Sequence, residues 1–212
     1  NHYVASAGLK EAREVVAASL RPVTRPEDVF ITAGVSEALD LALTALLEPG
    51  DEVLLPSPGY PLYNAIAARL RAQVVPYFLD EARGWAIDAE ELASKVTPRT
   101  KALVLCNPNN PTGSVATRAQ LLGVLEVARR HQLTVLSDEI YDRLLFSGEH
   151  VPTATLADDV PLITLNGLSK AYLVPGWRVG WLAFHTPKLL AEVAAAVQRL
   201  ADARLCGPGP FQ

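Results

Sequence analysis

Short apolar runs of strand length alternate with longer amphipathic segments along almost the whole chain. The runs that we interpret as strands are 29–32, 52–56, 73–79, 101–106, 133–136, 161–165 and 177–184. Between them, apolar residues recur at helical spacing in segments 8–20, 36–47, 63–70, 89–96, 117–131 and 188–205. Strands and helices that alternate in this way build a mainly parallel sheet between two helical layers. The sequence therefore predicts an α/β fold, with one three-layer α/β/α domain that spans residues 1–212.

Polar loops follow three of the predicted strands. Gly34 lies between strand 29–32 and a helix that starts near Ser36, a geometry that can aim backbone N–H groups and the positive helix end at a phosphate. Residues 107–113 form a rigid loop rich in asparagine and proline, and Asp138 follows strand 133–136. The carboxyl ends of parallel strands share one sheet edge, where α/β proteins bind ligands. Each signal alone is weak, because many such turns bind nothing.

The loop 166–181 places a lysine and an arginine between two predicted core strands. A lysine in a partly dry pocket has a lowered pKa and can form a Schiff base with a carbonyl, and we expect Lys170 to lie in such a pocket. Arg178 offers a bidentate fork to a phosphate. The plain alternative is that Lys170 is a surface lysine paired with a carboxylate.

Charge and composition exclude several classes of protein. The net charge is −4 with both signs interspersed, which gives no basic surface for nucleic acid. No apolar run reaches the roughly 18 residues of a membrane helix and no signal-peptide pattern opens the chain, so we expect a cytoplasmic protein without membrane contact. Cys106 and Cys206 lack metal-ligand spacing, which favours buried free thiols and no metal site. The absence of methionine indicates a processed protein or a piece of a longer one.

The lysine loop resembles that of a known enzyme family. Asn166-Gly-Leu-Ser-Lys170, Pro175-Gly-Trp-Arg178 and Gly180-Trp181 are similar to the cofactor loop of the fold type I aminotransferases of class I/II, which depend on pyridoxal 5'-phosphate. The Asn166-Gly-Leu-Ser-Lys170 motif, with Arg204-Leu-Cys206 later in the chain, is most similar to the alanine aminotransferase branch. The resemblance implies that Lys170 binds the cofactor as a Schiff base and that Arg178 holds its phosphate.

Further site residues are implied by the same resemblance. Asp138 would pair with the pyridine nitrogen, and Tyr141 and Asn110 would bond the ring oxygen. The backbone N–H groups of Gly34, Val35 and Ser36 would assist Arg178. The residue types alone leave other interpretations open: a surface aspartate for Asp138 and a turn asparagine with local bonds for Asn110.

Two tyrosines of this chain match family residues, and one glycine differs from the family pattern. Tyr60 matches the aromatic residue that stacks on the ring, although a packed core tyrosine is the alternative. Tyr3 matches a tyrosine that reaches the phosphate of a neighbouring subunit, which implies a homodimer with a shared active site. Many members have a serine where this chain has Gly167, so one phosphate contact is either missing or made by backbone.

The resemblance implies a pyridoxal-phosphate-dependent aminotransferase that transfers an amino group between an amino acid, alanine, and a 2-oxo acid, 2-oxoglutarate. It covers the large cofactor domain of the family, and the N-terminal arm and the C-terminal small domain are expected outside these residues. The chain by itself is therefore expected to be inactive. Two alternatives share the scaffold: a carbon–sulfur lyase, and the effector domain of a transcription regulator.

Overall fold

The computed structural model describes residues 4–203, so Tyr3 and the Arg204–Cys206 motif lie outside the described residues. The sheet contains β1 (Val29–Thr32), β2 (Glu52–Ser57), β3 (Gln73–Phe78), β4 (Thr100–Cys106), β5 (Thr134–Asp138), β6 (Leu162–Gly167) and β7 (Gly180–Phe184). The helices are α1 (Lys10–Ser19), α2 (Val35–Leu46), α3 (Pro61–Arg69), α4 (Ala89–Ser94), α5 (Arg118–His131) and α6 (Ala191–Ala203). Each of these elements overlaps a segment that the periodicity predicts.

The strands form one seven-stranded sheet in the order β1-β7-β6-β5-β4-β2-β3. Strand β7 runs antiparallel to its neighbours β1 and β6, and the other neighbouring strands pair in parallel. The prediction of a mainly parallel sheet is confirmed. Because β4, β5 and β6 are parallel, the residues that follow them emerge at one edge of the sheet.

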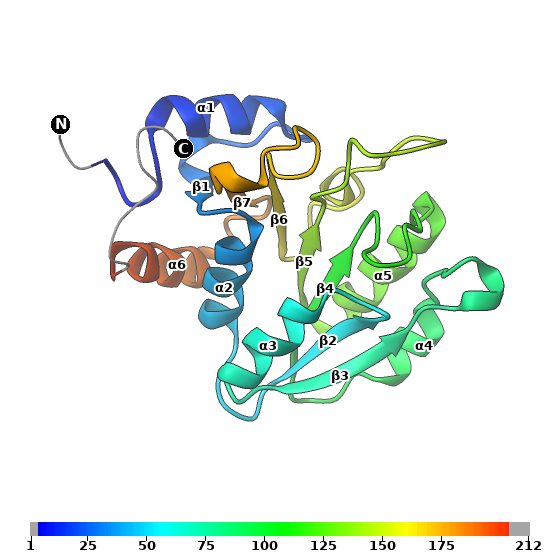
Figure 1. Cartoon of the computed structure of the whole chain (residues 1–212). Helices are drawn as coiled ribbons and strands as arrows, with labels where there is room; N and C mark the ends of the chain where they lie inside the picture. Colours follow the sequence, from blue (N-terminus) through cyan, green and yellow to red (C-terminus); the bar gives the residue numbers. More distant parts are fainter. Residues whose placement is uncertain (1–3, 204–212) are drawn as a thin grey trace.

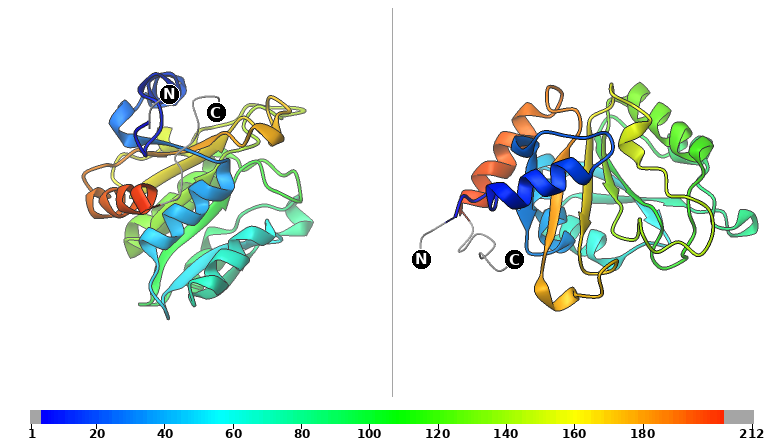
Figure 2. Two further views of the ribbon diagram at one scale, coloured as in Figure 1. Left: turned by 60° about the vertical axis from the view of Figure 1, so that its left-hand side comes forward. Right: turned by 90° about the horizontal axis from the view of Figure 1, so that it is seen from above.

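Helices cover both faces of the sheet (Figures 1 and 2). Helices α2, α3 and α6 bury their apolar sides against one face, and α4 and α5 pack on the other. Alternate residues of the strands point to the two layers: Phe30 joins the core under α2, whereas Val29 and Trp181 join a smaller core under α1. The predicted three-layer α/β/α architecture is therefore confirmed.

The start of β7 differs from the sequence prediction. The apolar run suggests a strand from Trp177, but residues Pro175–Trp177 form a 3-10 turn and Arg178 is left-handed, with φ 53°. The strand begins only at Gly180, because this turn and the left-handed residue interrupt the extended backbone before it. The backbone of Gly34 lies close to the first residue of the strand. A Cβ at Gly180 would lie 2.5 Å from the Gly34 carbonyl carbon. This contact joins segments far apart in sequence, so local periodicity does not show it.

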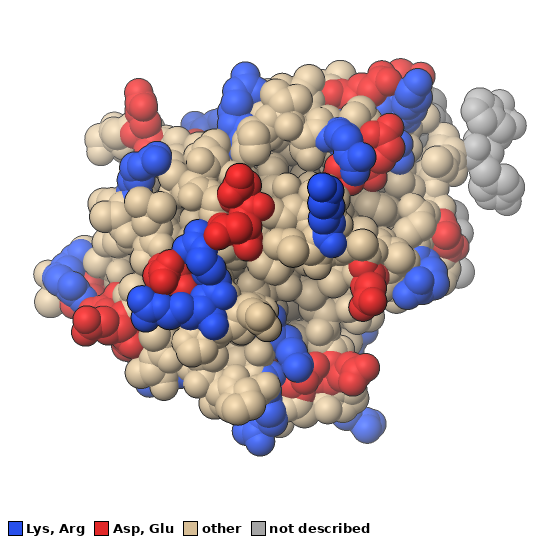
Figure 3. Space-filling model, turned by 180° about the vertical axis from the view of Figure 1, so that it is seen from behind, with Lys and Arg blue, Asp and Glu red and all other residues tan. Residues whose placement is uncertain are grey.

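The surface carries charges of both signs. Figure 3 shows Lys and Arg side chains interspersed with Asp and Glu on the face seen from behind. Several charges of the protein form ion pairs, as Arg129 does with Glu126 and Asp159. Within residues 4–203, no helix is both long and apolar enough to cross a membrane.

Candidate active site

A cavity of about 140 Å³ lies beyond the carboxyl ends of β4 and β5. Of the site residues that the sequence predicts within the described part of the chain, only Gly34 is not in its lining. The predicted residues that line it are Val35, Ser36, Tyr60, Asn110, Asp138, Tyr141, Lys170 and Arg178. Other lining residues were not predicted: Tyr63, Cys106, Ile140, Ser169 and Pro175. Five segments that lie far apart in the sequence therefore meet at one place.

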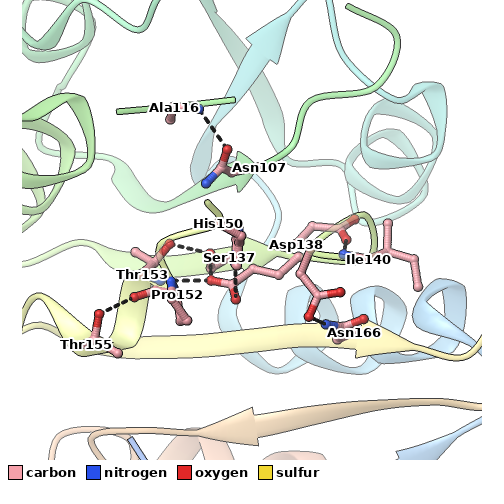
Figure 4. Close-up of polar contacts among 12 residues, drawn as sticks. Asn107, Ala116, Ser137, Asp138, Ile140, His150, Pro152, Thr153, Thr155 and Asn166 are labelled. Carbon is pink, nitrogen blue, oxygen red and sulfur yellow. Dashed lines mark hydrogen bonds and ion pairs between the residues drawn. The ribbon is translucent and has the colours of Figure 1, made fainter. Parts of the chain in front are cut away.

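Asp138 is the last residue of β5 and is only 3% exposed. Its Oδ2 accepts a hydrogen bond of 2.7 Å from the Tyr63 hydroxyl. Its Oδ1 accepts one of 3.2 Å from the Ile140 backbone N–H, which Figure 4 shows. Burial raises the pKa of Asp138 to about 6, against the opposing effect of these two bonds, and the charge of Glu139 adds to the rise. This burial excludes the alternative that Asp138 is a surface aspartate. A buried carboxyl of this kind favours a cationic partner in the cavity.

Lys170 lies on the turn that follows β6, with its Nζ 5.7 Å from the centroid of the Tyr141 ring. Lys170 is exposed. The prediction that it lies in a partly dry pocket is therefore wrong. The Tyr141 phenol is half-buried, and burial raises its pKa. The amine is therefore reachable from solvent and from the cavity, beside a neutral phenol.

The side chain of Arg178 lies against Gly34, which precedes the first residue of α2. The guanidinium donates from Nη2 to the Ala33 carbonyl and from Nη1 to the Pro175 carbonyl, both at 3.0 Å. Gly34 has φ 81°, and a Cβ there would lie 2.5 Å from Arg178 Nη2. Glycine is thus required both for the backbone and for the space that the arginine occupies. The arrangement places a cation beside the N-terminus of a twelve-residue helix, which suits an anion.

Gly167, the position at which the sequence resemblance implied a departure from serine, is the last residue of β6. A Cβ at this position would lie 2.7 Å from the Val179 carbonyl oxygen and 2.9 Å from the Gly180 Cα. The close approach of the β7 backbone therefore explains the glycine. The same approach leaves no room for a serine side chain in this backbone geometry.

Tyr60, just before α3, and Tyr63, in its first turn, differ in exposure. Tyr60 is 36% exposed, whereas Tyr63 is 1% exposed, and their rings meet edge to face with centroids 5.6 Å apart. Tyr60 is therefore not the packed core tyrosine that the sequence left open as an alternative. Tyr63 is the buried one of the two. Sequence reasoning missed Tyr63, although it lies in the first turn of the helix that Tyr60 precedes.

The loop after β4 is held by its own polar residues. The Asn107 side chain accepts from the Ala116 backbone N–H at 2.9 Å (Figure 4), and backbone bonds join Asn109 to Gly113 and Ser114. These residues supply the local bonds that a turn asparagine makes, and Asn110 lines the cavity.

Cys106, at the end of β4, is a buried free thiol, and burial raises its pKa to about 12.

Fold and site together define a class: an α/β domain whose sheet edge presents a lysine, a buried carboxyl and an arginine at a helix start. The sequence matches the family described as Aminotransferase class I and II over residues 1–211, and the chain belongs to this family. Members of the family depend in general on pyridoxal phosphate, use amino acids and keto acids, and are commonly dimers.

Individual relatives agree with this assignment. The chain is 42% identical to the glutamate-pyruvate aminotransferase AlaA of Escherichia coli (strain K12), over 99% of this chain and 53% of that protein. It is 44% identical to an alanine aminotransferase of Mycobacterium tuberculosis (strain H37Rv), over 99% of this chain and 51% of that protein. The chain thus spans about half the length of the curated relatives it matches.

Solved structures show the same fold. An alanine aminotransferase from Pyrococcus furiosus superposes with a TM-score of 0.96 at 41% identity, over 100% of this chain and 55% of that chain. An aspartate aminotransferase of Thermus thermophilus superposes with a TM-score of 0.92 at 34% identity, over 99% of this chain and 55% of that one.

The residues present fit pyridoxal phosphate. The buried carboxyl of Asp138, with its pKa raised to about 6, suits a protonated ring nitrogen. The cation and helix start at Arg178 and Gly34 suit a phosphate group. Lys170 lines the same cavity as both.

Proposed function

We propose that this chain is the cofactor-binding domain of a pyridoxal-phosphate-dependent aminotransferase, which transfers an amino group from alanine to 2-oxoglutarate. The observation that carries this proposal is the buried carboxyl of Asp138, which shares one cavity with Lys170 and Arg178. The choice of alanine is supported by the names of the relatives, which include alanine and glutamate-pyruvate aminotransferases. We assign residues 1–212 to this one domain.

The site residues predicted from the sequence would each have a role in holding the cofactor. Asp138 would hold the ring nitrogen, and Arg178 would hold the phosphate with the backbone N–H groups of Gly34, Val35 and Ser36. Lys170 would bind the cofactor covalently, and Tyr60 would cover the ring face. Asn110 and Tyr141 would bond the ring oxygen. When bound, pyridoxal phosphate supplies an electron sink for charge that develops on the substrate α-carbon.

The protein's own groups then orient the reactants and move one proton. Lys170 Nζ, as a free amine, takes the proton from the α-carbon of the amino acid and serves as its acid in the reverse half-reaction. Asp138 keeps its charge when a cation faces it, because an opposite charge offsets the burial that otherwise favours its neutral form. Tyr141, beside the amine, keeps its proton at neutral pH because burial raises the pKa of its phenol.

A homodimer with a shared site is part of the proposal. It rests on the match of Tyr3, which lies outside the described residues, to a tyrosine that reaches the partner's phosphate.

The reaction class is tested by product analysis on the protein at its natural length. With pyridoxal phosphate, alanine and 2-oxoglutarate, we expect pyruvate and glutamate to form in equal amounts, and no product with the Lys170→Ala variant. Release of a keto acid from a sulfur-containing amino acid without any acceptor would indicate a carbon–sulfur lyase instead. Cofactor binding without either reaction would indicate a sensor domain.

A further inference from the structure

A second buried carboxylate lies directly beside the site. Glu139 is only 4% exposed, and its Oε1 accepts hydrogen bonds from Ser137 Oγ at 2.8 Å and from the Thr153 backbone N–H at 3.0 Å. Its Oε2 lies 3.1 Å from Nε2 of His150, whose side chain is 8% exposed. Figure 4 shows Ser137, His150 and Thr153 grouped beside Asp138. Neither Glu139 nor any of its three partners lines the described cavity.

This carboxylate is charged in the folded protein. Burial alone would raise the pKa of Glu139, but the bonds from His150, Thr153 and Ser137 outweigh burial, and the net pKa lies below its usual value. A carboxylate only accepts, so the Nε2 atom of His150 carries the proton of their shared bond. A buried charge of this kind is a poor source of stability compared with a well-packed apolar group.

The pair closes the base of a loop that carries a site residue. Glu139 starts the segment that leaves the sheet after β5, and its backbone N–H donates to Leu165 of β6 at 2.9 Å. His150 and Thr153 lie where the segment returns. Between these ends, most of residues 143–149 are exposed. Tyr141 lies in this loop and Asp138 lies immediately before it, so the Glu139 contacts fix the loop on which both depend.

We propose that Glu139 and His150 are a positioning pair, which sets Asp138 and Tyr141 for the cofactor without touching it. The inference rests on the proposed pyridoxal phosphate site. It assigns a role in that site to two residues outside the cavity lining.

The fold contains a matched control for this pair. Glu52, the first residue of β2, is 3% exposed and lies at the opposite, amino-terminal edge of the parallel strands. Its carboxylate accepts from Thr97 Oγ1 at 2.6 Å, from Thr100 Oγ1 at 3.2 Å and from Arg99 Nη2 at 2.6 Å. Glu52 thus has the same chemistry and burial as Glu139, but its contacts lie away from the cavity.

The test compares Glu139→Gln, His150→Leu and Glu52→Gln in the protein at its natural length. We would measure the affinity for pyridoxal phosphate, the pH midpoint of the visible absorbance of the bound cofactor, and the unfolding temperature. Glu139→Gln and His150→Leu are expected to weaken cofactor binding by about tenfold or more and to move the pH midpoint. Glu52→Gln is expected to lower the unfolding temperature and leave both cofactor readouts unchanged. His150→Gln, whose amide can donate to Glu139, should recover much of the loss seen with His150→Leu.

Two results overturn the inference. One is an unchanged affinity and midpoint in folded Glu139→Gln and His150→Leu proteins, and the other is an equal loss in Glu52→Gln. If Glu139→Gln does not fold, the comparison of His150→Leu with His150→Gln decides, and equal cofactor readouts in these two variants contradict the role. A wild-type protein that binds no pyridoxal phosphate would contradict the proposed function itself, before any variant is compared.

Discussion

The hydroxyl of Tyr63 donates a 2.7 Å hydrogen bond to Asp138 Oδ2 and so ties α3 to the carboxyl end of β5. Both side chains are almost fully buried. The bond opposes the effect of burial on the Asp138 carboxyl, which otherwise favours its neutral form. A residue that the sequence reasoning passed over thus favours the charged form of the carboxyl at the centre of the site.

We expect Tyr63→Phe to destabilise the cofactor-free protein more at about pH 8 than at about pH 5, because the lost bond matters most when Asp138 is ionised. The expected loss at the higher pH is about 1–3 kcal/mol in the free energy of unfolding. Urea unfolding at both pH values measures it. Tyr77→Phe is the matched control: Tyr77 is 1% exposed, and its hydroxyl donates to the Val104 carbonyl at 2.8 Å, so its loss should not depend on pH in this range. Equal pH dependence in the two variants would contradict the proposed coupling.

The raised pKa of Asp138 has a consequence for stability. A carboxyl with a folded pKa of about 6 and an unfolded pKa of about 3.9 binds more protons in the folded state between these values, so stability falls as pH rises through this window. Asp138→Asn removes this contribution. The free energy of unfolding of the cofactor-free Asn variant, relative to wild type, should therefore rise between about pH 4 and pH 6 and level off above. A difference that stays flat across this window would show that Asp138 titrates normally.

Gly34→Ala should weaken pyridoxal phosphate binding by about tenfold or more, because the new methyl group displaces Arg178 Nη2 from the turn. The substitution also strains a backbone with φ 81°. Gly50→Ala separates the two effects, since Gly50 has φ 93° but a Cβ there meets nothing within 4 Å. Equilibrium dialysis of the cofactor should show the loss only at position 34. A similar loss at position 50 would point to general destabilisation.

Gly167→Ser should destabilise the protein without improving cofactor affinity. The new side chain would press on the Val179 carbonyl and on Gly180, and overpacking of this kind costs about 1–3 kcal/mol. Gly176→Ser on the same loop is the control, because a Cβ there meets nothing within 4 Å. Thermal unfolding and cofactor titration of both variants provide the measurement. Tighter cofactor binding by Gly167→Ser would mean that the β7 backbone yields and that the serine finds the phosphate.

The sequence predicted the architecture because its signals are local. Buried parallel strands such as β4 read as continuous apolar runs, and helix α5 shows its buried side at regular spacing. The motif residues that meet at the cavity lie at strand ends and loops, where parallel topology brings them together. Alternation of strands and helices was therefore enough to predict the sheet edge at which the cavity lies.

The features that the sequence did not predict depend on contacts between distant segments. The backbone of Gly34 lies close to Gly180, and the bond from Tyr63 to Asp138 joins a helix to a remote strand. The exposure of Lys170 depends on how its turn lies on the sheet edge. Periodicity carries no information on such contacts, because it reports only the burial of neighbouring residues on one element.

In the proposed site, Lys170 binds pyridoxal phosphate covalently in the cavity shared with Asp138 and Arg178. The most direct test is borohydride reduction of the cofactor-loaded protein, followed by mass spectrometry of its peptides. We predict one pyridoxyl group, carried by the peptide that contains Lys170, and no visible cofactor absorbance in the Lys170→Ala variant. A label on another lysine, or unchanged absorbance in Lys170→Ala, would contradict the assignment of this site.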